Sequence, residues 1–381
     1  MLPAQHDREV RLTAAAQHGG SSVVVDSPRS GARASSVVVG SENVGGHPVD
    51  PQAPLLAVED LVVEFNTPGG LIRANDGISY TVNRGETLAI LGESGSGKSV
   101  SAQAVMGILD IPPARIAGGS VRYRGVELLT LPDDEMREVR GAHIAMIFQD
   151  ALTALNPVFS VGWQIGEMFR LHTGTSKAEA EKKAIELMDM VRIPSARERV
   201  DSYPHEFSGG MRQRVMIAMA LALDPEVLIA DEPTTALDVT VQAQIMALLD
   251  DLQQQSGMGL ILITHDLGVV AEVADRVTIM YAGRIAETGT LDEVYANPRH
   301  PYTLGLMQSV PRTDQKGMRL DPIKGSPPDM LHVPSGCAFH PRCPLVRERC
   351  RNEIPAPQVL GTGRTSACFY HDEVGARAAS A

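Results

Sequence analysis

The stretch Thr87-Leu-Ala-Ile-Leu-Gly-Glu-Ser-Gly-Ser-Gly-Lys-Ser99 decides the fold of this chain. Its first five residues, Thr87–Leu91, are mostly apolar and predict a buried β-strand. The residues that follow fit the pattern Gly-x-x-x-x-Gly-Lys-Ser, which is typical of the loop that holds the phosphates of a nucleotide. A simple glycine-rich turn would not need the strand before the loop and the helical pattern after it. The sequence therefore predicts a nucleotide-binding protein.

Each residue type in this loop has an expected task. The glycines let backbone N–H groups turn toward a phosphate where a Cβ would obstruct them. Lys98 is expected to contact the β- and γ-phosphates, and Ser99 to bind Mg²⁺. The helix that begins here directs its positive end toward the nucleotide. The predicted nucleotide contacts are Gly92, Glu93, Ser94, Gly95, Ser96, Gly97, Lys98 and Ser99.

Length, charge and hydropathy limit the possible functions. The 381 residues are enough for two or three domains, and 43% of them are hydrophobic. The net charge of -12 argues against a nucleic-acid partner, because nucleic-acid binding depends on clustered Lys and Arg. The chain has no apolar run of about eighteen residues, and its start lacks the apolar middle of a signal peptide. We therefore expect a cytoplasmic protein that does not itself span a membrane.

Composition divides the chain into three parts. Residues 1–53 are rich in Gly, Ser, Ala, His and Pro and are predicted to be a disordered tail, with partner docking on two Ser-Ser-Val-Val-Val repeats as the alternative. Residues 54–290 are predicted to be the nucleotide-binding domain, which starts with antiparallel strands and contains a helical region at about 151–215. Residues 291–381 form a C-terminal extension that contains all four cysteines.

Polar side chains follow several predicted strands at the point where each strand ends. Those that come directly after a short apolar run are Gln149, Asp231, Glu232 and His265. In open α/β sheets, ligands bind at the carboxyl ends of the strands. Two surface acids in a turn would not explain why Pro-Thr-Thr follows Glu232. A lone histidine is usually structural, so His265 becomes a candidate only because of its neighbours.

These motifs together resemble one family, the ATP-binding cassette (ABC) ATPases. The stretch Phe207-Ser-Gly-Gly-Met-Arg-Gln-Arg214 looks like the family's signature motif Leu-Ser-Gly-Gly-Gln, with Phe in place of Leu and Met in place of Gln. Phe65 matches the aromatic residue that stacks on the base, although from the sequence alone its ring could equally fill the core of a sheet. The residues of the signature motif that touch phosphate in the family are intact: Ser208, Gly209 and Gly210.

The resemblance, which covers residues 55 to about 290, implies a fold and a set of roles. The fold is α/β: an ABC-type P-loop ATPase with an antiparallel β subdomain, a helical subdomain and a small C-terminal cysteine-containing extension. Glu232 would polarise the attacking water, and His265 would sense or stabilise the γ-phosphate. Asp238 lies where the family has a loop that contacts a second cassette, over whose nucleotide the signature motif closes. The implied cofactors are ATP and Mg²⁺, and the residues that would hold Mg²⁺ are Ser99, Gln149 and Asp231.

A narrower resemblance comes from the C-terminal third. The stretches His300-Pro-Tyr-Thr-Leu-Gly-Leu-Met, Gly325-Ser-Pro-Pro-Asp and Gly336-Cys-Ala-Phe-His-Pro-Arg-Cys-Pro look like the extension of ATPase subunits of bacterial dipeptide, oligopeptide and nickel importers. This resemblance implies an ATPase that powers peptide import from the cytoplasmic face of the cell membrane. The implied partners are a second, usually different, ABC ATPase subunit, two transmembrane permease subunits and an extracytoplasmic substrate-binding protein. Import of nickel or another small solute is the alternative, followed by a non-transport ABC ATPase.

The four cysteines predict a ligand site in the extension. Cys337, Cys343, Cys350 and Cys368 lie in a proline-rich segment that cannot bury much apolar area, so four thiolates around a metal centre would hold it together. Zinc sites usually contain a Cys-x2-Cys knuckle, which is absent here. The resemblance to peptide-importer ATPases, some of which carry an iron–sulfur cluster at this place, favours a [4Fe–4S] cluster. Zinc and unligated buried thiols are the alternatives.

Overall fold

The computed structural model of this chain describes residues 43–309 and 322–378. The first 42 residues of the predicted tail lie outside these ranges. The last residues of that tail belong to the fold, because the strands β1 (Asn43–Val44) and β2 (His47–Pro48) pair with each other and Val44 is buried in a hydrophobic core. The predicted tail was therefore too long at its C-terminal end.

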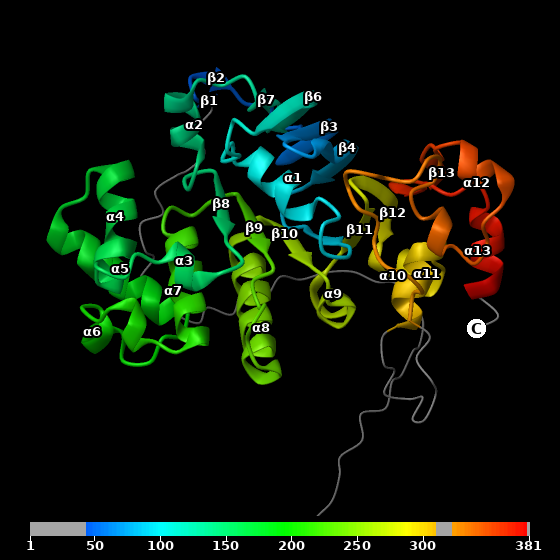
Figure 1. Ribbon diagram of the computed structural model, residues 1–381. Coiled ribbons are helices and arrows are strands. Elements are labelled where there is room, and N and C mark those ends of the chain that lie inside the picture. Colours follow the sequence, from blue (N-terminus) through cyan, green and yellow to red (C-terminus); the bar gives the residue numbers. More distant parts are fainter. Residues whose placement is uncertain (1–42, 310–321, 379–381) are drawn as a thin grey trace, which may run out of the picture. The chain divides into compact units, whose positions relative to one another are not determined.

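The largest sheet of the described residues has eight strands. In order across the sheet, they are β13 (Gln358–Gly361), β14 (Arg364–Ser366), β12 (Arg284–Thr290), β11 (Arg276–Tyr281), β5 (Thr87–Leu91), β10 (Gly259–Thr264), β9 (Val227–Asp231) and β8 (Ile144–Ile147). Figure 1 shows its strands β8, β9, β10, β11 and β12 between the helical region and the C-terminal extension. Strands β11, β5, β10, β9 and β8 are parallel, and the strands from β12 outward are antiparallel. The parallel strands are almost wholly apolar because both faces of this part of the sheet are covered.

A second, antiparallel sheet of four strands precedes and follows the phosphate-loop strand in the chain. Its order within the described residues is β4 (Gly70–Val82), β3 (Leu56–Thr67), β6 (Ala114–Tyr123) and β7 (Val126–Glu127). In β4, alternate residues from Ile78 to Val82 are buried, as expected for a strand with one face on a core, whereas the pairing of β3 with β4 is interrupted by register shifts. Together with one face of the large sheet, these strands enclose a core that includes Leu61, Ile78, Leu88 and Ile90. The predicted antiparallel layer is confirmed.

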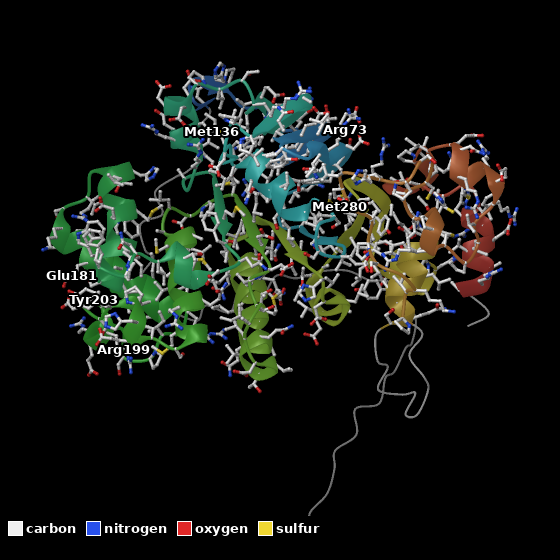
Figure 2. All side chains as sticks on the ribbon, viewed as in Figure 1. Arg73, Met136, Glu181, Arg199, Tyr203 and Met280 are labelled. Atoms are coloured by element: carbon white, nitrogen blue, oxygen red, sulfur yellow. The ribbon has the colours of Figure 1, made fainter. Side chains whose placement is uncertain are left out.

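The region predicted to be helical at about 151–215 consists of helices and short connections. Its elements are α3 (Ala151–Ala154), α4 (Val161–Thr173), α5 (Lys177–Met190), α6 (Ala196–Arg199), the 3₁₀ turn Pro204–Glu206 and α7 (Gly209–Leu221). Serine side chains begin the three longest of these helices: the hydroxyls of Ser160, Ser176 and Ser208 accept hydrogen bonds from N–H groups in the first turn. Glu181, Arg199 and Tyr203 mark the outer surface of this region in Figure 2.

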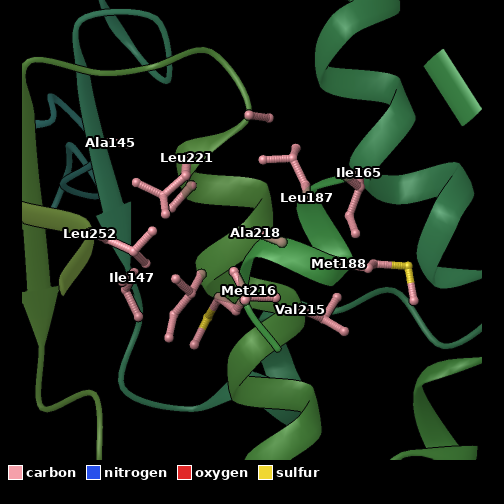
Figure 3. Packing of buried hydrophobic residues seen from close by; sticks show 14 of the residues in the cluster. Ala145, Ile147, Ile165, Leu187, Met188, Val215, Met216, Ala218, Leu221 and Leu252 are labelled. Atoms are coloured by element: carbon pink, nitrogen blue, oxygen red, sulfur yellow. The ribbon is translucent and has the colours of Figure 1, made fainter. Parts of the chain in front are cut away.

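Helix α7 joins the helical region to the large sheet. Its apolar residues pack between the strand β8 and the helices α4 and α5, which Figure 3 shows from close by. Each fully buried Ile or Leu side chain contributes about 1.5–3 kcal/mol to stability. The labelled members of this cluster are Ala145, Ile147, Ile165, Leu187, Met188, Val215, Met216, Ala218, Leu221 and Leu252.

The remaining helices flank the sheets and build the extension. They are α1 (Lys98–Val105), α2 (Asp133–Val139), α8 (Val239–Ser256), α9 (Leu267–Val273), α10 (Leu291–Ala296), α11 (Pro301–Gln308), the 3₁₀ turn His340–Arg342, α12 (Glu348–Asn352) and α13 (His371–Ala378). The extension has more regular structure than its proline content suggests, because β14 pairs with β12 and continues the large sheet. None of the helices in the described ranges combines the length and apolar composition that a membrane span requires.

Candidate nucleotide-binding site

The phosphate loop connects β5 to α1, as predicted. Gly97 has φ of 99°, and a Cβ at this position would lie 2.3 Å from the carbonyl oxygen of Ala74. Only glycine fits there, because both the backbone angle and the space exclude a side chain. The side chain of Asn75 donates a hydrogen bond to the carbonyl oxygen of Gly97 at 3.0 Å. The antiparallel sheet therefore supports the loop from the side.

The side chain of Lys98 folds back onto the phosphate loop. Its Nζ donates hydrogen bonds to the carbonyl oxygens of Gly92 at 2.7 Å and Glu93 at 3.1 Å. Burial lowers the pKa of Lys98, and the carboxylates of Glu232, Asp231 and Glu93 act against that shift. A buried cation held by carbonyl oxygens can exchange them for a phosphate, which carries a full negative charge.

Ser96 contributes a hydroxyl without a hydrogen-bond partner among the described residues to the same loop. This hydroxyl is buried. Ser94 and Gly95, at the tip of the loop, are exposed. An unpartnered buried hydroxyl, an ammonium and exposed backbone amides together form a site suited to an anion.

Ser99 and Asp231 meet at the place predicted for Mg²⁺. The Ser99 hydroxyl donates to Asp231 Oδ1 at 2.9 Å, although the two residues lie 132 positions apart. Asp231 is the last residue of β9 and is only 4% exposed, and burial raises its pKa. A hydroxyl and a buried carboxylate are hard oxygen ligands, which Mg²⁺ prefers. The residues present therefore fit this cation.

Glu232 lies at the centre of the polar residues at the strand ends. Its carboxylate accepts hydrogen bonds from Gln149 Nε2 at 2.9 Å and Thr235 Oγ1 at 2.8 Å. His265 Nδ1 lies 3.5 Å from the same carboxylate. The backbone of Glu232 has a positive φ of 46°, and its N–H donates to the Ile263 carbonyl oxygen at 2.8 Å. The structure thus brings Gln149, Glu232 and His265 together, as the sequence predicted.

The signature motif forms the start of α7 and is exposed. The Ser208 hydroxyl caps the helix through Met211 N–H at 3.4 Å, and Ser208 and Gly209 face solvent. Phe207, which replaces the usual Leu, is 3% exposed and belongs to the core of the helical region. The side chain that departs from the usual motif is therefore buried behind it, and Ser208 and Gly209 remain accessible.

Two further predicted contacts lie apart from this cluster. The Asp238 side chain caps α8 by accepting from Val241 N–H at 3.0 Å, and the residue is exposed. Phe65 lies near the end of β3, where its ring is half-buried against the core. The ring thus contributes to the core, which is the alternative role, and base stacking by Phe65 stays a prediction.

The four cysteines converge on one small cavity. Cys337, Cys343, Cys350 and Cys368 all line a cavity of about 20 Å³, together with apolar and aromatic side chains. Burial raises the pKa of Cys343 to about 11 and that of Cys368 to about 12. However, in residues 43–309 and 322–378 no three Cys, His, Asp or Glu side chains are arranged to hold a metal ion. The convergence agrees with a four-cysteine site, but the predicted iron–sulfur or zinc ligation has no support from this arrangement.

Sequence reasoning missed several residues that touch the site. Tyr302 and Arg342 reach the phosphate loop from the extension, and Asn75 reaches it from β4. The stretches that contain Tyr302 and Arg342 resemble parts of a family extension, but nothing in them indicates a contact more than 200 positions away. Thr235 could have been found, because it follows the Asp-Glu pair closely.

Comparison with known proteins agrees with this geometry. The family model described as ABC transporter matches residues 75–235, and the model described as Oligopeptide/dipeptide transporter, C-terminal region, matches residues 286–350. Among solved structures, the chain resembles the dimeric ATP-binding cassette MJ0796 in a post-hydrolysis state bound to ADP and Pi. The two chains are 26% identical with a TM-score of 0.56, over 62% of this chain and 98% of that one. It also resembles cbiO1 of Clostridium perfringens, part of the ABC transporter complex cbiONQ, with 31% identity, a TM-score of 0.55 and coverage of 64% and 91%.

Two curated relatives match nearly along their whole length. The chain is 49% identical over 319 residues to the dipeptide transport ATP-binding protein DppD of Bacillus subtilis, and the match covers 84% of this chain and 95% of that protein. It is 52% identical over 319 residues to the oligopeptide transport ATP-binding protein OppD of Salmonella typhimurium, covering 84% and 94%. The chain therefore belongs to the ABC transporter family of ATP-binding proteins, in the group with the oligopeptide/dipeptide transporter C-terminal region.

Proposed function

We propose that this chain is the ATP-hydrolysing subunit that powers peptide import through a membrane complex. The observation that carries the proposal is the cluster at the carboxyl ends of β8, β9 and β10, where Gln149 and His265 meet Glu232 beside the phosphate loop. The names of the dipeptide and oligopeptide transport relatives support peptides as the cargo.

The residues of the cluster divide the chemistry of hydrolysis between them. Lys98 would exchange its carbonyl partners for the β- and γ-phosphates and hold them in place. The Glu232 carboxylate would accept a hydrogen bond from the attacking water, with Gln149 and His265 next to it. Ser99, Asp231 and Gln149 would hold Mg²⁺, which neutralises charge on the phosphates when bound.

The exposed signature motif supports a second cassette as partner. Ser208 and Gly209 are exposed, and the Ser208 hydroxyl is used locally, as the cap of α7. Asp238 and the 83% exposed Val239 form a second accessible segment at the start of α8. We propose that these segments contact a second ABC ATPase subunit, so that each nucleotide lies between two chains. The MJ0796 cassette was solved as a dimer, which supports such an arrangement.

The helical region supports contact with membrane permeases. Between Gln149 and α4, the chain exposes apolar side chains at Val158 and Phe159, and the Phe159 ring stacks on Trp163 with centroids 4.1 Å apart. Exposed stacked aromatic rings are costly in water and favour burial against a partner. We propose that this surface, close to the Gln149 segment, meets the two transmembrane permeases at the cytoplasmic face of the membrane. An extracytoplasmic binding protein would deliver the peptide on the other side.

The cysteine cavity supports a buried group in the extension, and we propose that it is a [4Fe–4S] cluster. The four cysteines line one cavity, and four thiolates are the ligand set that such a cluster uses. Anaerobically purified protein should be brown, absorb broadly near about 400 nm and contain about four irons per chain. A colourless protein with one zinc and no iron or sulfide would reject the cluster.

Reconstituted uptake tests the proposed function. This chain, with its second ATPase, permeases and binding protein in proteoliposomes, should accumulate labelled peptides when ATP is present on the cytoplasmic side. A panel of dipeptides, oligopeptides and nickel ions separates the possible substrates. If nickel is taken up and no peptide is, the proposed cargo is wrong and nickel is the substrate. ATP hydrolysis without uptake of any solute would reject the transport role.

A further inference from the structure

The C-terminal extension holds a residue of the phosphate loop. Arg342 Nη1 donates to Glu93 Oε2 at 2.6 Å, and Arg342 Nη2 donates to Glu93 Oε1 at 2.9 Å, across 249 positions of sequence. The Arg342 side chain is 6% exposed and the Glu93 side chain is 27% exposed, so the guanidinium of this bidentate ion pair is buried and the carboxylate is half-buried. Such pairs fix both distance and orientation, because the planar guanidinium matches the planar carboxylate.

Neighbouring groups fix the guanidinium of Arg342. Its Nε donates to the Lys324 carbonyl at 3.2 Å, and Nη1 also donates to the Tyr281 hydroxyl at 3.3 Å. The guanidinium carbon lies 5.8 Å from the ring centre of Tyr281 and 5.9 Å from that of Phe339. Arg342 is thus held by residues of β11 and the extension, and not only by Glu93.

The extension also holds the backbone of Glu93. The Glu93 N–H donates to the hydroxyl of Tyr302 at 3.0 Å, and Tyr302 is fully buried against Tyr281 and Phe339. The Glu93 carbonyl accepts from Lys98 Nζ at 3.1 Å. Glu93 is therefore fixed by the extension through its side chain and its N–H, while its carbonyl touches the lysine proposed to bind phosphate.

The charge of Glu93 makes this contact important for nucleotide binding. Glu93 directly follows the first glycine of the loop, where the phosphates of ATP would bring several negative charges. A free carboxylate at this position would repel them, and the repulsion would be strong because the site is partly buried. The bidentate contact with Arg342 neutralises that carboxylate.

From these contacts we infer that Arg342 is a positioning residue for the nucleotide: it keeps Glu93 neutralised and the first turn of the phosphate loop in place. The inference rests on the proposed ATP site. It makes the extension a part of that site, although Arg342 lies 249 positions further along the chain than Glu93. The alternative is that Arg342 only anchors the extension. In that case, replacing Arg342 would lower the thermal stability and leave the ATP affinity of the folded protein normal.

Matched variants of the full chain separate these roles. Arg342→Gln removes the positive charge and leaves Glu93 unpaired, and Arg342→Gln combined with Glu93→Gln removes both charges. Arg347→Ala is the control, because Arg347 also anchors the extension, through Glu373 at 2.6 Å and the ring of Tyr370, and these contacts lie within the extension itself. Titration with a fluorescent ATP analogue gives the affinity, ATP hydrolysis gives KM and kcat, and thermal unfolding reports the fold.

We expect Arg342→Gln to weaken analogue binding and raise KM by about tenfold, with a smaller change in kcat. The double variant should recover most of the affinity, because no unpaired carboxylate remains, and Arg347→Ala should bind as wild type does. Equal affinity of Arg342→Gln and wild type, or no recovery in the double variant, would overturn the inference. Failure of the wild-type chain to bind the analogue would instead reject the proposed ATP site.

Discussion

Among single residues, Glu232 carries most of the proposed chemistry. Its carboxylate collects contacts from Gln149, Thr235 and His265, which come from three separate stretches of the chain. The backbone of Glu232 also has a positive φ of 46°. A non-glycine residue held in that conformation is costly, and such strain occurs most often at functional sites.

Glu232→Gln should keep ATP binding and reduce hydrolysis at least about 100-fold, because the amide keeps the size of the side chain but cannot accept a proton. Lys98→Ala should instead weaken binding itself, because it removes the charge that faces the phosphates. Binding titrations and steady-state hydrolysis on the same preparations distinguish the two effects. Glu272→Gln, at an exposed position on α9, serves as the control. Near-normal turnover in Glu232→Gln would show that another group activates the water.

Sequence alone found the residues of this site that come in local patterns. The phosphate loop, Gln149, the Asp231–Glu232 pair and His265 each stand at the end of an apolar run, so the sheet brings them together. Arg342 and Tyr302 could not be found in this way, because their contacts with Glu93 depend on how the extension folds back. Such long-range contacts leave no periodic or local signal.

Among the elements, α7 combines the packing of the helical region with an exposed functional end. Its apolar side chains join β8 to α4 and α5, while Ser208 and Gly209 at its start remain accessible. Prediction of elements worked best where the local pattern was clear, as for the apolar strand β5 and the helical region at about 151–215. It was weakest in the extension, because the pairing of β14 with β12 is a tertiary contact that short, proline-flanked segments do not reveal.

Ser208→Arg tests the proposed role of the start of α7. The introduced arginine side chain should leave the ATP affinity of the isolated chain nearly unchanged, because the motif is proposed to face a partner's nucleotide. It should reduce ATP hydrolysis by the assembled complex at least about tenfold. Ser176→Arg is the matched control, since Ser176 caps α5 with the same geometry as Ser208 caps α7. Loss of the isolated chain's own ATP binding in Ser208→Arg would contradict a contact with a partner's nucleotide.

At the level of the whole molecule, the described residues combine the proposed half of a hydrolytic site with a signature motif whose Ser208 and Gly209 are exposed. We propose that the residues around Lys98, Asp231 and Glu232 hold the phosphates, the cation and the attacking water of one ATP. In the proposed arrangement, the signature motif of a second cassette covers the other side of that ATP. In the same proposal, the permeases bind the exposed apolar surface around Val158 and Phe159 and so couple hydrolysis to import.

One comparison tests most directly whether the ATP site is divided between two chains. It sets the rate of ATP hydrolysis by the purified chain against the rate of the fully assembled complex, at equal concentration of this chain. We predict a low rate for the chain alone and an increase of at least about tenfold when the second ATPase and the permeases are added, because only then is each nucleotide enclosed. Equal rates for the isolated chain and the complex would contradict the proposed division of the site between two chains.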